Sequence, residues 1–367
     1  MNKSEYNNNL IHVSAPGRIV LGGEHQDYFN LPVISAGISL RIEIRGKLLS
    51  KPIIQLRLHN MHRTLNIPLQ FPIPYRFRRS YLQSGLNNIH RAGYKIPGFE
   101  AEVISKIPRN AGLSSSSALC VAWAKFLLHI SSSNLNDNTD PQKIAGWAHK
   151  FEVAEFNEPG GKQDQLATAL GGINYIKFPV NQPAEIEPIK LDKNLTLVIG
   201  HSLIRKNTLK TILRIRRQVA DALTQLRGAP KLDYLKELNE EDIPNGREYQ
   251  TLRGVLRIRD LTQQMKNALM SNQPQYKWGE LIQKQHSILR DNLRLSIPRI
   301  ERMVSNAVNA GAFGAKINGS GEGGCMFALC HKDETDQVAK AIEKAQGSPF
   351  IVHIDEGVRL EKNNSSL

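Results

Sequence analysis

The chain has 367 residues, of which 40% are hydrophobic and 22% charged, and it carries a net charge of +14. That length and balance are those of a globular protein with room for two packed domains. A membrane-spanning protein is excluded because no run of about 18 apolar residues occurs. A disulfide framework or zinc site is excluded because the three cysteines form no C-x-x-C pair, so we expect a soluble protein of the reducing cytoplasm.

The first hundred residues alternate short strand-like runs with turns rich in Gly and Pro. One of these runs, GRIVLGG, contains Arg18 and is followed at once by the polar letters EHQDY. Two carboxylates and an imidazole, Glu24, His25 and Asp27, thus lie within four residues, next to Tyr28. So polar a segment directly after a hydrophobic strand indicates that something other than packing holds these side chains.

A second motif, IPRNAGLSSSSALC, spans residues 107–120 and leads into an apolar segment that predicts a helix buried on most sides. The free N–H groups and the positive end of the dipole at a helix start form a natural cradle for phosphate, and a serine hydroxyl there can also bind Mg²⁺. A simple serine N-cap is the alternative, although four serines exceed what one cap needs. The candidate residues are Asn110, Ala111, Gly112, Leu113, Ser114, Ser115, Ser116 and Ser117.

Two carboxylates follow in a helix-turn-helix pattern. Residues 140–157 predict a helix that begins with a capping Asp140 and Pro141 and contains Glu152. The turn EPGGK then places Asp164 at the start of another helix, where it either caps that helix or projects into the space that the turn opens. Divalent-metal and phosphoryl chemistry use two carboxylates brought together in this way.

The second half opens with a strand near residue 195 and is dominated by helical patterns. Its most basic stretch, residues 204–218, predicts an amphipathic helix with Leu209, Ile212, Leu213 and Val219 on one side. A solvated basic face, attraction of anionic substrates such as nucleotides, and nucleic-acid binding all remain open. The lack of an aromatic platform or zinc-finger spacing disfavours nucleic acid.

The motif KINGSGEGGCMFAL, residues 316–329, contains G-x-G-x-x-G. An apolar strand follows it where a dinucleotide-binding motif needs a helix, and no H-R-D or D-F-G sequence of a protein kinase occurs. The loop is therefore either a tight turn or a place where backbone approaches a ligand or another segment closely. We expect an α/β domain over residues 1–194 and an α+β domain over residues 195–367.

Taken in order, SAPGRIVLGGEH, the serine motif, GGKQDQ and the glycine loop resemble the galactokinase-like sugar kinase branch of the GHMP kinase superfamily, over residues 12–330. The resemblance implies an α+β fold of two domains, one like domain 2 of ribosomal protein S5 and one ferredoxin-like. It also implies that ATP and the acceptor bind in the cleft between them.

The resemblance implies roles for individual residues. Residues 110–117, with Gly319 and Gly321 in support, would bind ATP, and Ser115 or Ser116 together with Glu152 would bind Mg²⁺. Asp164 would orient or deprotonate the acceptor hydroxyl, and Arg18 would stabilise that carboxylate or the phosphoryl group in transfer. Glu24, His25, Asp27 and Tyr28 match the G-E-H-T-D-Y of galactokinases and would bind sugar hydroxyls.

The expected function is ATP-dependent phosphorylation of a monosaccharide, at its anomeric hydroxyl, by a monomer or homodimer that binds neither nucleic acid nor membrane. Two alternatives remain: a mevalonate-type kinase, because FNLP and HSLIRKNT look like mevalonate kinase segments, and a non-catalytic regulator that binds sugar and ATP. Two residues depart from the family pattern. Asn110 stands where the family usually has glycine, and Glu322 stands where it usually has a glycine or an aromatic residue.

Overall fold

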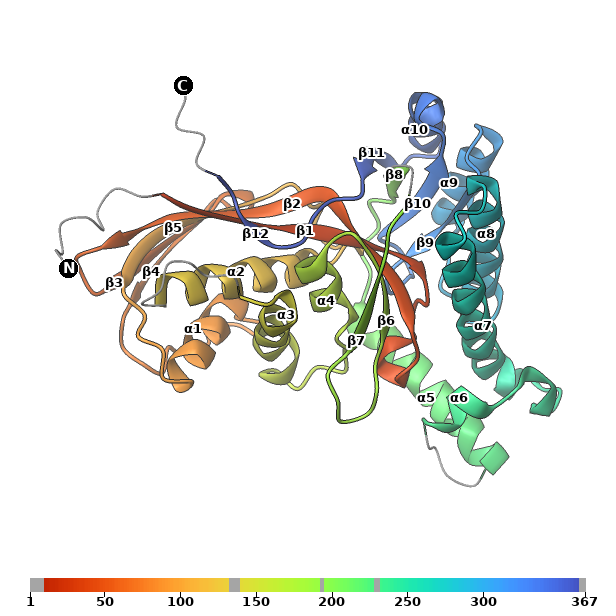
Figure 1. Ribbon diagram of the computed structural model, residues 1–367, viewed down its shortest axis with the longest axis horizontal. Coiled ribbons are helices and arrows are strands. Elements are labelled where there is room, and N and C mark those ends of the chain that lie inside the picture. Colours follow the sequence, from red (N-terminus) through yellow and green to blue (C-terminus); the bar gives the residue numbers. More distant parts are fainter. Residues whose placement is uncertain (1–9, 132–138, 192–194, 228–231, 363–367) are drawn as a thin grey trace.

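The computed structural model describes residues 10–131, 139–191, 195–227 and 232–362, which form two units, each with its own sheet (Figure 1). The first sheet has the strand order β12-β1-β2-β5-β3-β4, with β6 paired to β2 and β7 to β6. Only the β3–β5 pair is parallel among these described strands. The strands of the first sheet are β1 (Ile11–Gly22), β2 (Val33–Leu49), β3 (Ile53–Leu58), β4 (Arg63–Pro68), β5 (Gly98–Ser105), β6 (Ile173–Lys177), β7 (Glu185–Ile189) and β12 (Arg359–Leu360).

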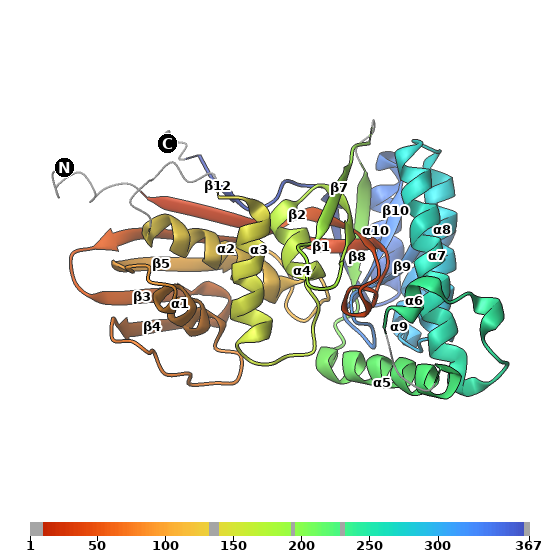
Figure 2. The same cartoon turned by 60° about the horizontal axis from the view of Figure 1, so that its bottom comes forward.

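Four helices cover one face of the first sheet (Figures 1 and 2). They are α1 (Tyr81–Arg91), α2 (Ser115–Ser131), α3 (Pro141–His149) and α4 (Gln163–Leu170). As predicted from its apolar sequence, α2 is buried on most sides, and its Trp123 stacks on Phe126 at 5.7 Å between ring centroids. The predicted cap of α3 is also present, because Asp140 Oδ1 accepts a hydrogen bond from the Gln142 N–H at 3.0 Å. The last turn after α3, Lys150–Ala154, is a π-helix that contains Glu152.

The second unit is a four-stranded antiparallel sheet with helices packed against it (Figure 1). Its strands are β8 (Thr196–His201), β9 (Gly314–Asn318), β10 (Cys325–Cys330) and β11 (Ser348–His353), and its helices are α7 (Gln250–Met270), α8 (Gln275–Asp291), α9 (Pro298–Asn309) and α10 (Thr335–Lys344). The order β11-β8-β10-β9 is 4-1-3-2 in chain order, which is the ferredoxin-like arrangement. The predicted α+β fold is thereby confirmed.

The basic segment forms α5 (Thr208–Arg227), which is followed by the short α6 (Tyr234–Glu237). The helix is amphipathic as predicted, but its buried stripe passes through Ile215 and Val219. Placing Leu213 on that stripe was wrong: its side chain is 55% exposed, because two residues turn a helix by about 200°. Leu209 and Ile212 face a cavity instead.

The end of the described chain returns to the first sheet. In β12, Leu360 pairs with Val13 of β1. Just before it, the buried Arg41 of β2 donates hydrogen bonds to Asp355 Oδ2 at 3.0 Å and to the Gly357 carbonyl at 2.8 Å. The sequence assigns residues 195–367 to the second domain, but residues 355–360 pack on the first.

Within the residues described above, no helix is long and apolar enough to cross a membrane.

Candidate active site

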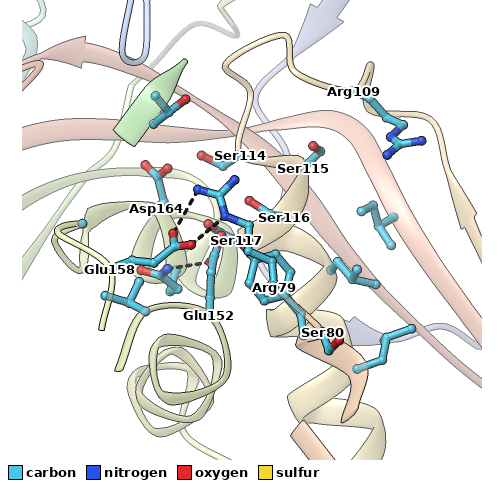
Figure 3. Close-up of a pocket in the computed structure, with 18 of the residues that line it drawn as sticks. Arg79, Ser80, Arg109, Ser114, Ser115, Ser116, Ser117, Glu152, Glu158 and Asp164 are labelled. Atoms are coloured by element: carbon cyan, nitrogen blue, oxygen red, sulfur yellow. Dashed lines mark hydrogen bonds and ion pairs between the residues drawn. The ribbon is translucent and has the colours of Figure 1, made fainter. Parts of the chain in front are cut away.

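A cavity of about 910 Å³ lies between the two units and contains most of the predicted site residues. One part of its wall comes from β4 and the segments that flank it, between β3 and the start of α1. The rest comes from the end of β1, the 3-10 turn Asp27–Phe29, the serine loop before α2, the turn before α4, the start of α5 and the glycine loop between β9 and β10. Residues far apart in sequence therefore meet in one space. Figure 3 shows the end of this cavity around the serines of α2.

Arg18 and Asp164 form an ion pair inside the cavity. Arg18 donates from both Nε and Nη2 to Asp164 Oδ1 at 2.8 Å, and from Nη1 to the Gly112 carbonyl at 2.5 Å. The Arg18 side chain is 6% exposed whereas Asp164 is 37% exposed. The guanidinium is thus fixed between the serine loop and a carboxylate that remains accessible to a ligand.

The serine loop is shaped by its backbone. Asn110, Gly112 and Ser114 have φ values of 57°, 85° and 58°, so left-handed residues alternate just before α2. Alternation of this kind turns successive N–H groups inward, and the free N–H groups of the helix start add to them. Asn110, Gly112 and the side chains of residues 114–117 line the cavity, which supports the predicted phosphate cradle.

Glu152 lies beneath the serines, and Gln165 Nε2 donates to its Oε2 at 2.7 Å (Figure 3). Burial raises the pKa of Glu152, while hydrogen bonds with Ser116, Ser117 and Gln165 oppose the rise. A buried carboxylate with hydroxyl groups and the Asp164 charge nearby has the oxygen ligands and the negative charge that a cation needs.

The glycine loop packs directly on the serine loop. A Cβ built on Gly319 would lie 2.9 Å from the Gly112 carbonyl oxygen, and one built on Gly324 would lie 2.8 Å from the Ala111 carbonyl oxygen. Asn318 joins the same contact, since its Nδ2 donates to the Gly112 carbonyl at 2.8 Å. The interpretation of the loop as a close approach of two backbones is confirmed.

Glu24 also lines the cavity, and Lys316 of β9 holds its Oε1 in a short ion pair. Both side chains are buried, at 1% and 0% exposure. Burial raises the pKa of Glu24 and lowers that of Lys316, while each charge opposes the shift of the other. The second oxygen of Glu24, Oε2, is buried without a hydrogen-bond partner among the described residues.

His25 and Tyr28 form a hydrogen-bonded pair, with 2.6 Å between His25 Nδ1 and the Tyr28 hydroxyl. Burial lowers the pKa of His25 to about 3, and a backbone hydrogen bond with Ser320 opposes the lowering. The imidazole is therefore neutral at physiological pH. Its Nε2 has no hydrogen-bond partner of good geometry in the described part of the chain.

Asp27 lies opposite the start of α4. Its Oδ2 accepts a hydrogen bond from the Gln163 N–H at 3.2 Å, and a Cβ on Gly161 would lie 1.9 Å from that same oxygen. Burial raises the pKa of Asp27 to about 6, and the nearby Asp164 carboxylate adds to the rise. Two carboxylates therefore share this part of the cavity, with Arg18 lowering the pKa of Asp27 in return.

Not every predicted residue lines the cavity. Ala111 and Leu113 point into the hydrophobic core, and Gly321 packs against Leu295. These residues contribute through backbone shape. Gln26, which lies between His25 and Asp27 in the sequence, points away from the cavity and donates to the Val255 carbonyl at 3.2 Å.

Lys206 is a residue of the cavity that sequence reasoning missed. A Cβ on Gly112 would lie 2.7 Å from its Nζ, so the ammonium group lies directly on the serine loop. Burial lowers its pKa to about 8. The signal in the sequence was HSLIRKNT, which resembles a mevalonate kinase segment, but the spacing alone does not show which cation points inward.

Arg79 and Glu158 were also missed. Figure 3 shows their ion pair among the residues that line the cavity, with Arg79 Nε 2.6 Å from Glu158 Oε1. Arg79 comes from the segment before α1 and Glu158 from the turn before α4, so no local pattern connects them.

Three protein-family models match the chain. The N-terminal domain of GHMP kinases matches residues 80–172, the C-terminal domain of GHMP kinases matches residues 265–348, and the galactokinase galactose-binding signature matches residues 3–46. The chain belongs to the GHMP kinase superfamily. Within it, the chain is galactokinase-like, because the galactose-binding signature covers the segment with Glu24, His25 and Asp27.

Known GHMP kinases of two kinds are similar to it. A galactokinase of Canis lupus familiaris is 27% identical over 90% of this chain and 86% of its own. A mevalonate kinase of Pyrococcus abyssi is also 27% identical, over 96% of this chain and 98% of its own. The overall sequence likeness therefore does not separate the two kinds.

Solved structures agree on the fold. Galactokinase of Lactococcus lactis, solved in complex with galactose, has a TM-score of 0.80 at 22% identity and covers 97% of this chain and 96% of its own. Mevalonate kinase of Methanococcus jannaschii has a TM-score of 0.72 at 20% identity and covers 95% of this chain and 99% of its own. Both similarities confirm the two-domain GHMP kinase fold.

Proposed function

We propose that this protein is an ATP-dependent kinase that phosphorylates a hydroxyl group of a neutral monosaccharide, with the anomeric hydroxyl as the expected acceptor. The observation that carries the proposal is the position of the Arg18–Asp164 pair. One guanidinium bonds to the Gly112 carbonyl of the serine loop and to the Asp164 carboxylate. The pair thus lies where a phosphate cradle meets a cluster of buried polar side chains.

Each residue has a role that follows from its position. The serine loop and the start of α2 would bind the phosphates of ATP, with Lys206 against the charge of the transferring group. Asp164 would accept a hydrogen bond from the acceptor hydroxyl and take its proton as the oxygen–phosphorus bond forms. Arg18 keeps Asp164 oriented and stabilises negative charge in the transition state, which is the main contribution a protein makes to phosphoryl transfer.

Magnesium fits the residues around Glu152. Among the described residues, no group of three or more His, Cys, Asp or Glu side chains could hold a metal ion alone, so the ion would also need hydroxyl and phosphate oxygens. Mg²⁺ bound to substrate phosphates commonly takes only one or two carboxylates from the protein. Glu152, Ser115 and Ser116 would hold the ion, which would supply positive charge to the ATP phosphates.

The acceptor end of the cavity, around Glu24 and His25, favours a neutral polyol as the ligand. Glu24 Oε2 and His25 Nε2 are buried polar atoms without hydrogen-bond partners of good geometry among the described residues, and both side chains line the cavity. Such atoms cost free energy unless a ligand satisfies them, and neighbouring hydroxyl groups of a sugar would do so. Two cations of the cavity, Arg18 and Lys206, contact the serine loop at Gly112 and are therefore placed to bind phosphate and not an anionic acceptor.

Two observations still favour the mevalonate-type alternative. Some relatives are mevalonate kinases, and the segment that carries Lys206 resembles a mevalonate kinase segment. The regulator alternative is disfavoured because a protein that only binds sugar and ATP has no need of an Arg18–Asp164 pair. The buried, free state of all three cysteines, Cys120, Cys325 and Cys330, supports a reducing cytoplasm as the location.

The test is ADP release by the purified chain with ATP and Mg²⁺ over a panel of free neutral hexoses, a uronic acid, mevalonate and homoserine. Turnover of at least one neutral sugar, with no turnover of the anionic acceptors, is expected. Turnover of mevalonate but of no sugar would contradict the monosaccharide proposal and favour the mevalonate-type kinase. Saturable sugar binding without ADP release would favour the regulator.

A further inference from the structure

Glu322 has a backbone conformation that is unusual for its residue type. It lies in the glycine loop, where Gly319, Gly321, Gly323 and Gly324 have φ values of 76°, 78°, 129° and 74°, and its own φ is 58°. Glycine adopts such a φ freely, whereas a residue with a Cβ is strained there. A glutamate at this position therefore needs an explanation from its side chain.

The Glu322 carboxylate binds two residues of α5. Arg214 Nη2 donates to Oε1 at 2.9 Å, and Thr211 Oγ1 donates to Oε2 at 2.8 Å. Arg214 is itself fixed, since its Nη1 donates to the Leu293 carbonyl at 3.1 Å. Both carboxylate oxygens are thus used, one of them in a charge-assisted hydrogen bond.

Two further contacts hold the glycine loop, one to the segment between α8 and α9 and one to α5. The Glu322 N–H donates to the Leu295 carbonyl at 2.6 Å, and Ser320 Oγ donates to Thr208 Oγ1 at 3.2 Å. The glycine loop is therefore attached to α5 in its first turn, through Thr208, and again in the next, through Thr211 and Arg214.

The cavity side of the same turns carries Leu209 and Ile212, and Lys206 lies just before the helix. Neither Glu322 nor Arg214 lines the cavity. Because an α-helix is stiff over two turns, fixing one side of α5 also fixes the residues on the other. The contacts of Glu322 thus set the distance between the cavity wall and the serine loop.

We propose that Glu322 is a positioning residue for phosphoryl transfer: by holding the first turns of α5 on the glycine loop, it places Lys206, Leu209 and Ile212 around the bound substrates. The catalytic half of this inference rests on the proposed kinase function. It assigns a use to the one position of the glycine loop where the sequence departs from the family pattern.

Three variants of the full chain test it. Glu322→Gly removes the carboxylate and also relieves the backbone, so it is expected to fold. Glu322→Gln keeps one acceptor oxygen for Arg214 or Thr211. Gln346→Gly is the matched control, because Gln346 also has a positive φ, 63°, but is exposed after α10.

For Glu322→Gly we expect a melting temperature equal to or above that of the wild type, and kcat/KM lower by about 10- to 100-fold, the scale for misplaced substrate-binding groups. The KM for the acceptor and the dissociation constant for MgADP should both rise. Glu322→Gln should fall between Glu322→Gly and the wild type, whereas Gln346→Gly should change the melting temperature alone.

Hydrogen–deuterium exchange gives a readout that needs no turnover. In Glu322→Gly, residues 206–214 should exchange faster than in the wild type, and in Gln346→Gly they should not. Unchanged exchange of these residues together with unchanged affinity for MgADP would overturn the inference. If the wild type phosphorylates no acceptor, the proposed function fails, and exchange and MgADP affinity still decide the role of Glu322.

Discussion

The two parts of the cavity, the phosphate end around the serine loop and the acceptor end around Glu24 and His25 in the proposed function, are built in different ways. At the phosphate end the shape comes from backbone: alternating left-handed residues before α2, and glycines of the two loops in contact through their main chains. At the acceptor end the surface comes from buried side chains, with Glu24 paired to Lys316 and His25 to Tyr28. Backbone contacts of this kind leave little room for variation, whereas side-chain pairs can be exchanged singly.

This difference explains why the reaction class is clearer than the acceptor. A loop that binds phosphate serves every kinase of the family equally, and relatives of two substrate kinds share the fold. Acceptor choice depends on a few hydrogen-bonding atoms. Changes at the phosphate end should therefore affect all acceptors alike, and changes at the acceptor end should affect the acceptor KM.

The largest effect is expected at the junction of the two ends. Asp164→Asn should lower kcat by at least about 100-fold for any acceptor, because it removes the proton acceptor. Affinity for MgADP should change little. Asp140→Asn is the control, since asparagine replaces aspartate well as a helix cap, and near-wild-type turnover in a folded Asp164→Asn protein would contradict the assignment.

Gly112→Ala should damage the phosphate end. Its Cβ would lie 2.7 Å from Lys206 Nζ and 2.8 Å from the Asn318 carbonyl oxygen, at a φ of 85°. We expect kcat/KM to fall by about 10- to 100-fold with every acceptor, measured by initial rates over ATP and acceptor. Gly146→Ala, in α3 with no heavy atom within 4 Å of the new Cβ, should leave the rates unchanged, and equal rates in both variants would refute the contact.

Lys316→Met should affect the acceptor end alone. Loss of the cation leaves Glu24 buried without a counter-charge, which costs about 3–5 kcal/mol of unfolding free energy, and the acceptor KM should rise about 10-fold, the equivalent of about 1.4 kcal/mol. Urea unfolding and initial rates measure the two effects.

Two companions make the Lys316 result interpretable. The double variant Glu24→Gln/Lys316→Met should recover stability but not the acceptor KM, and the exposed Lys284→Met should resemble the wild type. An unchanged acceptor KM in Lys316→Met would show that the pair has no part in acceptor binding.

The smallest effect is a pH dependence at Asp27, whose pKa burial raises to about 6. The ionised carboxylate accepts hydrogen bonds from hydroxyl groups through both oxygens, whereas the protonated form has lost part of this acceptor capacity and its charge. The acceptor KM should therefore rise as pH falls through about 6. The raised pKa also means that folding is less favourable above the folded pKa, so stability should decrease as pH rises from about 4 to 6. Asp27→Asn should remove both effects and raise the melting temperature at pH 7.

That prediction fails if the acceptor KM of Asp27→Asn retains the wild-type dependence on pH between 5 and 8.

Sequence reasoning located the residues whose position is set locally. The Pro-Gly-Gly turn placed Asp164 at the second residue of α4, and the serine run marked the start of α2, because turns and caps act over a few residues. Lys206, Asn318 and the Arg79–Glu158 pair were missed because their partners come from other elements. Lys316 and Glu24 are 292 residues apart, so a carboxylate that looks available in the sequence is already paired in the fold.

Leu213 shows the other limit. Hydrophobic spacing predicted α5 correctly, but the same apolar set was compatible with two buried stripes about 100° apart. Packing of Ile215 and Val219 against neighbouring elements chose one of them and left Leu213 in solvent. The choice depends on tertiary contacts that periodicity does not contain.

The pairing of β12 with β1 has a consequence for synthesis on the ribosome. Val13 is made early and its partner Leu360 almost 350 residues later, so one edge of the first sheet stays open while the second unit emerges. Exposed strand edges pair readily with other chains, and completion of this edge depends on long-range closure, which is slow. Nascent chains arrested before residue 359 should therefore be more prone to aggregate than chains released after it.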